Sequence, residues 1–249
     1  MKIKTNIAFF FLTCSVGSFA QNKISPKDTE VWEPVPEIVS VNEKGIPSDA
    51  IILLSDKVNE FVNHQGEPIA WTYEDGIMTV APRKKGEPKN KNVYTKQKFG
   101  DCQLHLEFRT PIDNEGVAQR NGNSGVFLQT LYEIQVLNSH KNVTYSNGQL
   151  GAIYKQSIPM ANPAKPMGEW QTYDIVFTAP VWEGNKVVKK ASMTAFINGV
   201  LVQNHFELGG PTTFVGKPKY AAKDHGKKPL MLQEHNNYVS YRNIWIREL

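Results

Sequence analysis

The sequence has little cysteine, no strong excess of charge of either sign and few long apolar runs, and each shortage excludes a class of protein. Its two cysteines are Cys14 and Cys102, and Cys14 lies in a segment that we expect to be removed, so no disulfide can form within the domain. Without the two lysines of that segment the formal net charge falls from +4 to +2, which argues against a nucleic-acid partner. No other apolar run approaches the length of a membrane span.

The motifs of several easily recognised enzyme classes are also missing. The chain has no G-x-S-x-G elbow, P-loop, dinucleotide fingerprint or H-E-x-x-H sequence. These absences exclude the corresponding hydrolase, nucleotide-binding and zinc-protease classes. No apolar pattern of helical period extends beyond two turns and no internal repeat occurs, so strands are expected to dominate.

The first twenty residues have the features of an export signal. Two lysines precede an apolar run at Ile7–Leu12, and Ser18-Phe19-Ala20 fits a small-x-small cleavage site. We therefore predict a signal peptide at residues 1–20, cleaved after Ala20, and a periplasmic or secreted protein. The alternative is lipidation at Cys14, which would give an outer-membrane lipoprotein, although Thr13 is a poor match to the small residue expected before the cysteine.

Beyond the signal, composition and patterning predict an arm followed by one domain. Residues 21–48 are rich in proline and show no sustained period, so we expect an extended N-terminal arm. Residues 49–249 are predicted to form a single domain, because all-β sandwiches often reach this size as one unit. The hydrophobic fraction of 40% and the charged fraction of 21% are ordinary for a globular protein.

The clearest strand is Asp101–Thr110. Its apolar members alternate strictly with its polar members, which are Gln103, His105, Glu107 and Arg109. Cys102 falls on the apolar side and is expected to be a buried, inert thiol. Trp170–Ala179 repeats the pattern, and two last strands are expected at 230–235 and 239–249.

Asp75-Gly76 and Asn198-Gly199 each separate two alternating runs, which predicts hairpins with type I′ turns. The lysine-rich stretch 83–98 is interpreted as a solvated loop. So many amphipathic strands must bury their apolar faces against a second sheet, and we predict an all-β, two-sheet antiparallel sandwich of jelly-roll type.

Polar side chains occur on strands that did not need them for folding. Alternation places Glu133 and Gln135 on one face of their strand, with Tyr132, Ile134 and Val136 on the other. One interpretation is a structural hydrogen-bonding pair. The alternative is a binding site, and it rests on the number of polar side chains on strands. Three strands carry polar faces: His105, Glu107 and Arg109; Glu133 and Gln135; and Gln233 and His235. So much polar surface borders solvent or a ligand, and amides, carboxylates and arginines are the groups that bind neutral sugars.

We therefore predict a carbohydrate groove that Asn123 joins if the strand register allows. The residue types of His105, Glu107, Glu133 and His235 also suit a metal, but nothing in the sequence defines a ligand spacing. The sequence predicts no cofactor and no metal ligands, and leaves a bound divalent cation as an open alternative.

The joint motifs of the chain resemble those of the 3-keto-disaccharide hydrolase family, in the same order, from about residue 50 to Leu249. The segments that carry the resemblance are Phe99–Pro111, Gly122–Val126, Tyr132–Leu137, Gly151–Tyr154, Gly168–Ile175, Asn198–Val200, Leu232–His235 and Tyr241–Arg247. The resemblance implies a concanavalin A-like jelly roll and a secreted or periplasmic enzyme acting on an oligosaccharide or glycoside. It implies cleavage of glycosides already oxidised to a ketone at sugar carbon 3, by hydrolysis or β-elimination.

Such a reaction needs a base for the proton on carbon 2, an acid for the leaving group and donors for the enolate oxygen. Our hypothesis makes His235 or Glu133 the base, and Tyr154 or the other member of that pair the acid. Substrate binding is assigned to Arg109, Asn123, Gln135, Gln233, His105 and Glu107. Two alternatives stay open: a conventional glycosidase using Glu107 and Glu133, and a lectin-like module that binds glycans without cleaving them.

Overall fold

The structure, a computed structural model, describes residues 24–88, 90–112 and 116–249. The predicted signal peptide and Cys14 lie outside these residues. The chain divides into two units with the boundary after Ile38. In the described part of the first unit, a short 3₁₀ helix η1 (Pro26–Thr29) is capped by reciprocal bonds between Ser25 and Asp28. The second unit contains all the strands described below.

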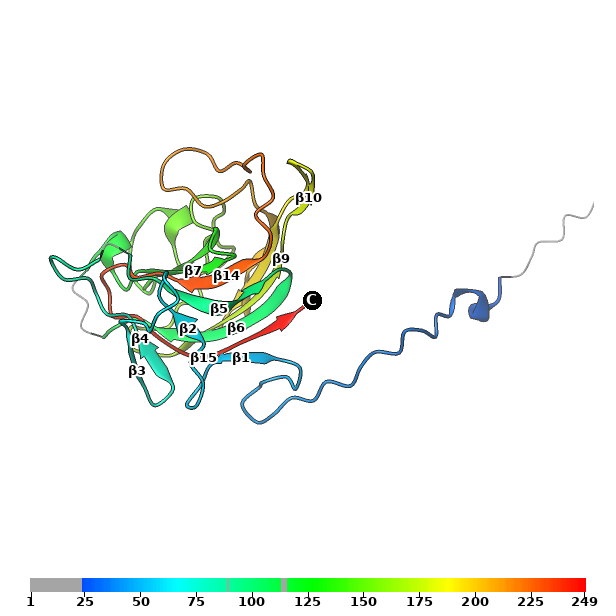
Figure 1. The fold of residues 1–249 in the computed structure, drawn as a ribbon, viewed down its shortest axis with the longest axis horizontal. Coiled ribbons are helices and arrows are strands. Elements are labelled where there is room, and N and C mark those ends of the chain that lie inside the picture. The colour runs from blue at the N-terminus through cyan, green and yellow to red at the C-terminus, as the bar shows by residue number, and fades with distance from the viewer. Residues whose placement is uncertain (1–23, 89, 113–115) are drawn as a thin grey trace, which may run out of the picture. The chain divides into compact units, whose positions relative to one another are not determined.

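The second unit is a sandwich of two antiparallel sheets (Figure 1). The larger sheet has the strand order β13-β12-β9-β6-β15-β4-β3, and β1 also pairs with β15. In chain order its strands are β1 (Ile51–Leu54), β3 (Thr72–Glu74), β4 (Ile77–Thr79), β6 (Cys102–Arg109), β9 (Gln171–Thr178), β12 (Ser192–Ile197), β13 (Val200–Glu207) and β15 (Ser240–Glu248).

The smaller sheet has the order β2-β5-β14-β7-β8. Its strands are β2 (Phe61–Val62), β5 (Val93–Phe99), β7 (Ser124–Leu128), β8 (Tyr132–Val136) and β14 (Lys228–Leu232). A separate hairpin pairs β10 (Val181–Glu183) with β11 (Lys186–Lys189). Strands distant in sequence are neighbours in both sheets, as in a jelly roll, so the predicted fold class is confirmed.

Local sequence signals agree closely with these elements. Asp75 and Gly76 have φ angles of 49° and 75°, and Asn198 and Gly199 have 52° and 78°, so both predicted hairpins turn with positive φ. The prediction of a loop over residues 83–98 is wrong for its second half, which forms most of β5. Thr95 is buried in β5, whereas Lys96 and Lys98 of the same strand are exposed to solvent. The lysines therefore made this strand resemble a solvated loop in the sequence.

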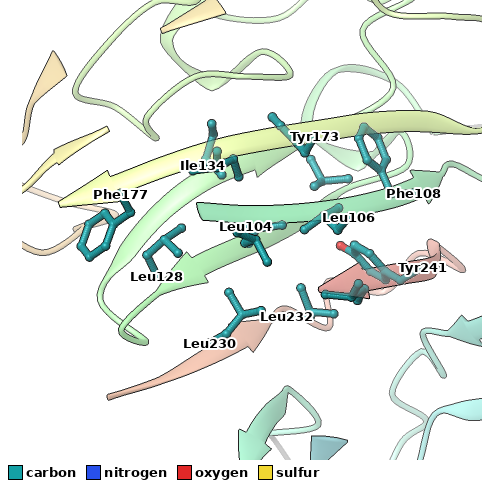
Figure 2. Packing of buried hydrophobic residues seen from close by; sticks show 14 of the residues in the cluster. Leu104, Leu106, Phe108, Leu128, Ile134, Tyr173, Phe177, Leu230, Leu232 and Tyr241 are labelled. Atoms are coloured by element: carbon teal, nitrogen blue, oxygen red, sulfur yellow. The ribbon is translucent and has the colours of Figure 1, made fainter. Parts of the chain in front are cut away.

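The apolar faces of the two sheets meet in a single core (Figure 2). Leu104, Leu106 and Phe108 of β6 are fully buried against residues of the small sheet such as Ile134 and Leu232. Burying each such side chain stabilises the fold by roughly 1.5–3 kcal/mol. Cys102 is free and buried in the same layer, and burial raises the pKa of its thiol to about 12, as expected for an inert group.

Across residues 24–88, 90–112 and 116–249, the helical elements are single 3₁₀ turns, namely η1, η2 (Ala118–Arg120) and η3 (Ser146–Gly148). Within the described residues no helix has the length and apolar character needed to cross a lipid bilayer. The outer face of the small sheet is overhung by two irregular connections, one between β8 and β9 and one between β13 and β14 (orange in Figure 1). These connections form the walls of the site described next.

Candidate active site

A polar pocket of about 240 Å³ lies on the outer face of the small sheet. Strand pairing forms its floor, because Phe127 of β7 lies opposite Glu133 of β8, and Gly125 lies opposite Gln135. The backbone amide of Gln233, which directly follows β14, donates to the carbonyl of Gly125 at 2.9 Å. This bond adds Gln233 to the row of residues that forms the floor. The described residues that line the pocket are Asn123, Phe127, Glu133, Gln135, Tyr154, Thr212, Phe214, Gln233 and His235.

Gly125 leaves the centre of this floor open. A β-carbon added there would lie 2.6 Å from Oε1 of Glu133, 2.9 Å from a ring carbon of Phe127 and 3.3 Å from Oε1 of Gln233. The missing side chain therefore allows the carboxyl and carboxamide groups to converge over the backbone of β7. The role of this glycine is close approach, because its φ angle is not positive.

Among the described residues, Glu133 is the only one with a carboxyl group that lines the pocket. Its side chain is 5% exposed and makes no hydrogen bond to any described residue. Burial therefore raises the pKa of Glu133 from 4.5 to about 8. At neutral pH the protonated form therefore predominates, so this group can deliver a proton.

Gln135 lines the pocket, and its carboxamide is held in position by hydrogen bonds. Its Nε2 donates to Oε1 of Gln119 at 3.0 Å and to the carbonyl of Gly148 at 3.3 Å. Its Oε1 is buried and has no partner among the described groups. Asn123 is held in a similar way, since its Nδ2 donates to the Gln119 carbonyl at 2.6 Å. A buried acceptor without a partner favours a ligand that brings a donor, such as a hydroxyl.

Two tyrosines of the large sheet reach through the core and hold the strands of the pocket from below. The Tyr173 hydroxyl donates to the backbone carbonyl of Gln135 at 2.6 Å. The Tyr241 hydroxyl donates to Oγ of Ser124 at 2.7 Å, and that Oγ donates to the carbonyl of Gln233 at 2.6 Å. These bonds position the backbones of Gln135 and Gln233 relative to the core.

The walls are attached to β8 through its backbone. The Thr212 hydroxyl accepts a hydrogen bond from the backbone amide of Glu133 at 3.0 Å. The backbone amide of Tyr154 donates to the Glu133 carbonyl at 3.2 Å. The hydroxyls of Tyr154 and Tyr145 share a hydrogen bond of 2.7 Å. Burial and this bond raise the pKa of Tyr154, so its phenol stays protonated.

His235 lies at the mouth of the pocket. Its side chain is exposed, and its ring makes no hydrogen bond to a described residue. Its backbone is positioned by Asn237, which donates to the His235 carbonyl at 2.8 Å and accepts from the Gly122 amide at 2.8 Å. The ring is therefore free to contact a ligand.

The prediction that one groove gathers all three polar strand faces is wrong for β6. His105, Glu107 and Arg109 lie on the outer face of the large sheet, because their apolar neighbours occupy the core between the sheets. His105 is hydrogen-bonded to Asp174 at 2.7 Å. The Glu107 carboxylate accepts hydrogen bonds from Arg242 at 2.6 Å and from Asn243 at 3.0 Å. Arg109 lies over the ring of Trp170.

The remaining predicted residues do meet. Glu133, His235, Tyr154, Asn123, Gln135 and Gln233 all line the pocket. The set considered for a metal is not assembled, since His105 and Glu107 face away from Glu133. Within the described residues no group of three or more His, Cys, Asp or Glu side chains is placed to hold a metal ion.

Sequence reasoning missed Phe127, Thr212, Phe214 and the supporting Gln119. Phe127 could have been found, because it shares the two-residue period of Gly125 on its strand. Thr212 and Phe214 lie in an irregular connection without a periodic pattern. The exposure of Phe214 becomes visible only in the structure.

Comparison with solved structures places this architecture among glycosyl-hydrolase-like proteins. A candidate glycosyl hydrolase from Parabacteroides distasonis is 42% identical, with a TM-score of 0.82 over 91% of this chain and 97% of its own. Two further candidate glycosyl hydrolases from that organism share the fold at 21% and 15% identity, with TM-scores of 0.55 and 0.56. They cover 80% and 76% of this chain, and 99% and 89% of their own.

No curated protein matches the chain. The model of one family, described as a 3-keto-alpha-glucoside-1,2-lyase-like domain, matches residues 52–247. That match spans both sheets and every residue of the pocket. The chain therefore belongs to the 3-keto-disaccharide hydrolase family, as its sequence motifs indicated.

Proposed function

We propose that this protein cleaves glycosides that carry a ketone at sugar carbon 3, by β-elimination across carbons 1 and 2. Family membership and the 42% identical relative support a carbohydrate-active enzyme, and the family description supports the 3-keto substrate. The observation that carries the proposal is Glu133, a buried carboxyl without a partner among the described residues, in a pocket lined by amide, hydroxyl and aromatic groups. Keeping such a group costs stability, which is typical of catalytic sites.

The reaction follows from the acidity that the ketone confers on carbon 2. A base takes the proton on carbon 2, and the electron pair of that bond forms an enolate with the carbonyl oxygen. The enolate then reforms the ketone while the bond from carbon 1 to the aglycone oxygen breaks, leaving a double bond between carbons 1 and 2. An acid protonates the departing oxygen, and later addition of water gives the hydrated sugar.

In this scheme Glu133 is the acid and His235 is the base. Glu133 is supported as the acid because its raised pKa keeps it protonated at neutral pH. His235 is supported as the base because its ring faces the same pocket and is not engaged by a described residue. Tyr154 is the alternative acid, although its hydroxyl is already bonded to Tyr145.

Substrate positioning falls to the amides. Oε1 of Gln135 accepts a hydrogen bond from a sugar hydroxyl, and Asn123 and Gln233 contact neighbouring hydroxyls from the same row. The ring of Phe127 provides an apolar surface for the C–H face of the sugar. Together these groups would keep carbon 2 near the base and the aglycone oxygen near the acid.

A conventional glycosidase receives no support from the geometry. Such enzymes need two carboxyl groups roughly 5–10 Å apart across the scissile bond. The predicted partner of Glu133 was Glu107, which lies on the opposite outer face of the sandwich and is bonded to Arg242. Glu133 alone supports proton transfer to a leaving group, not a two-carboxylate mechanism.

The test is turnover of a 3-keto-glucoside beside its unoxidised parent. We expect product only from the oxidised sugar, and loss of turnover by orders of magnitude in Glu133→Gln and in His235→Ala with unchanged circular dichroism. Product from the unoxidised parent would refute the keto route. Binding of both sugars without product would identify a lectin-like module.

A further inference from the structure

A second cavity continues from the polar pocket along the outer face of the molecule. It has a volume of about 590 Å³ and is lined by Tyr145, Asn147, Lys155, Phe214, Val215 and Gly216. Phe214 lines both cavities, and the hydrogen bond between the Tyr154 and Tyr145 hydroxyls joins their walls. The two cavities are therefore neighbouring parts of one surface.

The first cavity is too small for a whole glycoside. Its volume of about 240 Å³ lies below the roughly 300–1,000 Å³ of pockets that enclose a drug-sized ligand. One sugar ring fits, and the group attached to its carbon 1 must extend outside. The second cavity is the neighbour that shares a lining residue with the first, so it is where that group would lie.

The chemistry of the second cavity differs from that of the first. Two of its three polar side chains already have partners: the Tyr145 hydroxyl is bonded to Tyr154, and Nζ of Lys155 donates to the Phe214 carbonyl at 2.7 Å, which leaves the carboxamide of Asn147. In the first cavity, by contrast, Glu133 and Oε1 of Gln135 have no partner among the described groups. A second sugar needs hydrogen bonds for its hydroxyls, and this cavity offers few.

The aromatic surface is held in place by Lys155. Its ammonium group lies 4.1 Å from the centroid of the Phe214 ring, 5.5 Å from that of Tyr154 and 5.9 Å from that of Tyr145. The lysine thus contacts one side of Phe214 and bonds the backbone of the same residue. Phe214 is nevertheless 74% exposed, so most of its ring is available to a ligand.

We infer that the second cavity is an aglycone subsite for an aromatic ring, with Phe214 as the stacking surface and Lys155 as the residue that positions it. The inference rests on the proposed function for the sugar in the first cavity. It narrows the substrate to a 3-keto-glycoside of an aryl or arylalkyl alcohol, in preference to a 3-keto-disaccharide. Stacking of two aromatic rings stabilises a complex beyond the effect of the apolar area that the rings bury.

The experiment compares benzyl and methyl 3-keto-glucosides of one anomeric form, together with a 3-keto-disaccharide. Benzyl and methyl alkoxides are leaving groups of similar basicity, so a difference between them reports on binding. We expect Phe214→Ala to lower kcat/KM at least about tenfold more for the benzyl substrate than for the methyl substrate. Lys155→Met should reproduce part of the benzyl effect, and the exposed Ile158→Ala should have none.

Equal losses on the benzyl and methyl substrates would overturn the inference, as would an equal loss on the disaccharide. Calorimetric binding to Glu133→Gln separates this result from failure of the proposed function. Tighter binding of the benzyl than of the methyl compound, abolished by adding Phe214→Ala, would support the subsite even in an enzyme without 3-keto turnover. Turnover of all three substrates with no preference in binding would leave the function standing and refute the subsite.

Discussion

Replacing Glu133 with glutamine should make the protein more stable and inactive at the same time. The carboxyl of Glu133 has no partner among the described residues, and its burial raises its pKa from 4.5 to about 8. Between these two values the folded protein keeps the proton while the unfolded chain has released it. Because the folded state then binds more protons, the free energy of unfolding falls as pH rises, and this loss is complete above the folded pKa.

The magnitude follows from the width of that interval. Each pH unit in which the two states differ by one proton changes the free energy of unfolding by about 1.4 kcal/mol. From pH 4.5 to 7 the burial of Glu133 therefore costs on the order of 3 kcal/mol, which is large beside the 5–15 kcal/mol typical of a whole domain. Glutamine has nearly the same shape and no proton to lose, so Glu133→Gln removes this pH dependence.

Urea unfolding at pH 5, 6, 7 and 8 measures the effect. The difference in unfolding free energy between Glu133→Gln and wild type should grow by about 1 kcal/mol per pH unit in favour of the variant. Glu74→Gln removes an exposed carboxylate from β3 and should follow the wild type. Parallel curves for Glu133→Gln and wild type would refute the reasoning, because they would mean that Glu133 ionises equally in both states.

Four further predictions concern the floor, the mouth and the supports of the pocket, and the N-terminus. Gly125→Ala should lower kcat about 100-fold with little change in melting temperature, because the new methyl displaces the Glu133 carboxyl; full activity would contradict its role in close approach. His235→Ala should lose about 10²–10⁴-fold in kcat and regain part of it with added imidazole, and activity kept without rescue would rule it out as the base. Tyr241→Phe should cost about 1 kcal/mol in urea unfolding, and no loss would mean that its bond to Ser124 contributes little. In an exporting host the intact mass should correspond to cleavage after Ala20, whereas a lipid-modified Cys14 would contradict this.

Local patterns were sufficient for much of the fold. Strict alternation in Asp101–Thr110 predicted a strand with one buried face, and the structure forms β6 over Cys102–Arg109 with that burial. The Asp-Gly and Asn-Gly turns were equally readable, since positive φ at two successive residues is a demand that few residue pairs meet. These features depend on neighbours within a few residues, which the sequence displays directly.

The candidate site was predicted only in part, and the division follows the strands. Glu133 and Gln135 share a face with Asn123 across the β7–β8 hairpin, so a short connection determines their meeting. Gln233 joins them because its backbone amide donates a hydrogen bond to the carbonyl of Gly125, more than a hundred residues earlier in the chain. Phe214 lies in a connection whose course depends on the contacts that it makes, and no pattern in the chain predicts that course.

By itself, the sequence determined which side chains of each strand face the core and which face outward, because that alternation is a property of every extended backbone. It determined the hairpin turns, and its motifs identified the family. Only the tertiary structure decided to which sheet each polar face belongs. Strand β6 pairs with β9 and β15 in the large sheet, whereas β8 pairs with β7 in the small one, so Glu107 and Glu133 point away from opposite sides of the sandwich. Strand order is set by hydrogen bonds and packing between distant segments, and the alternation within a strand carries no record of its partners.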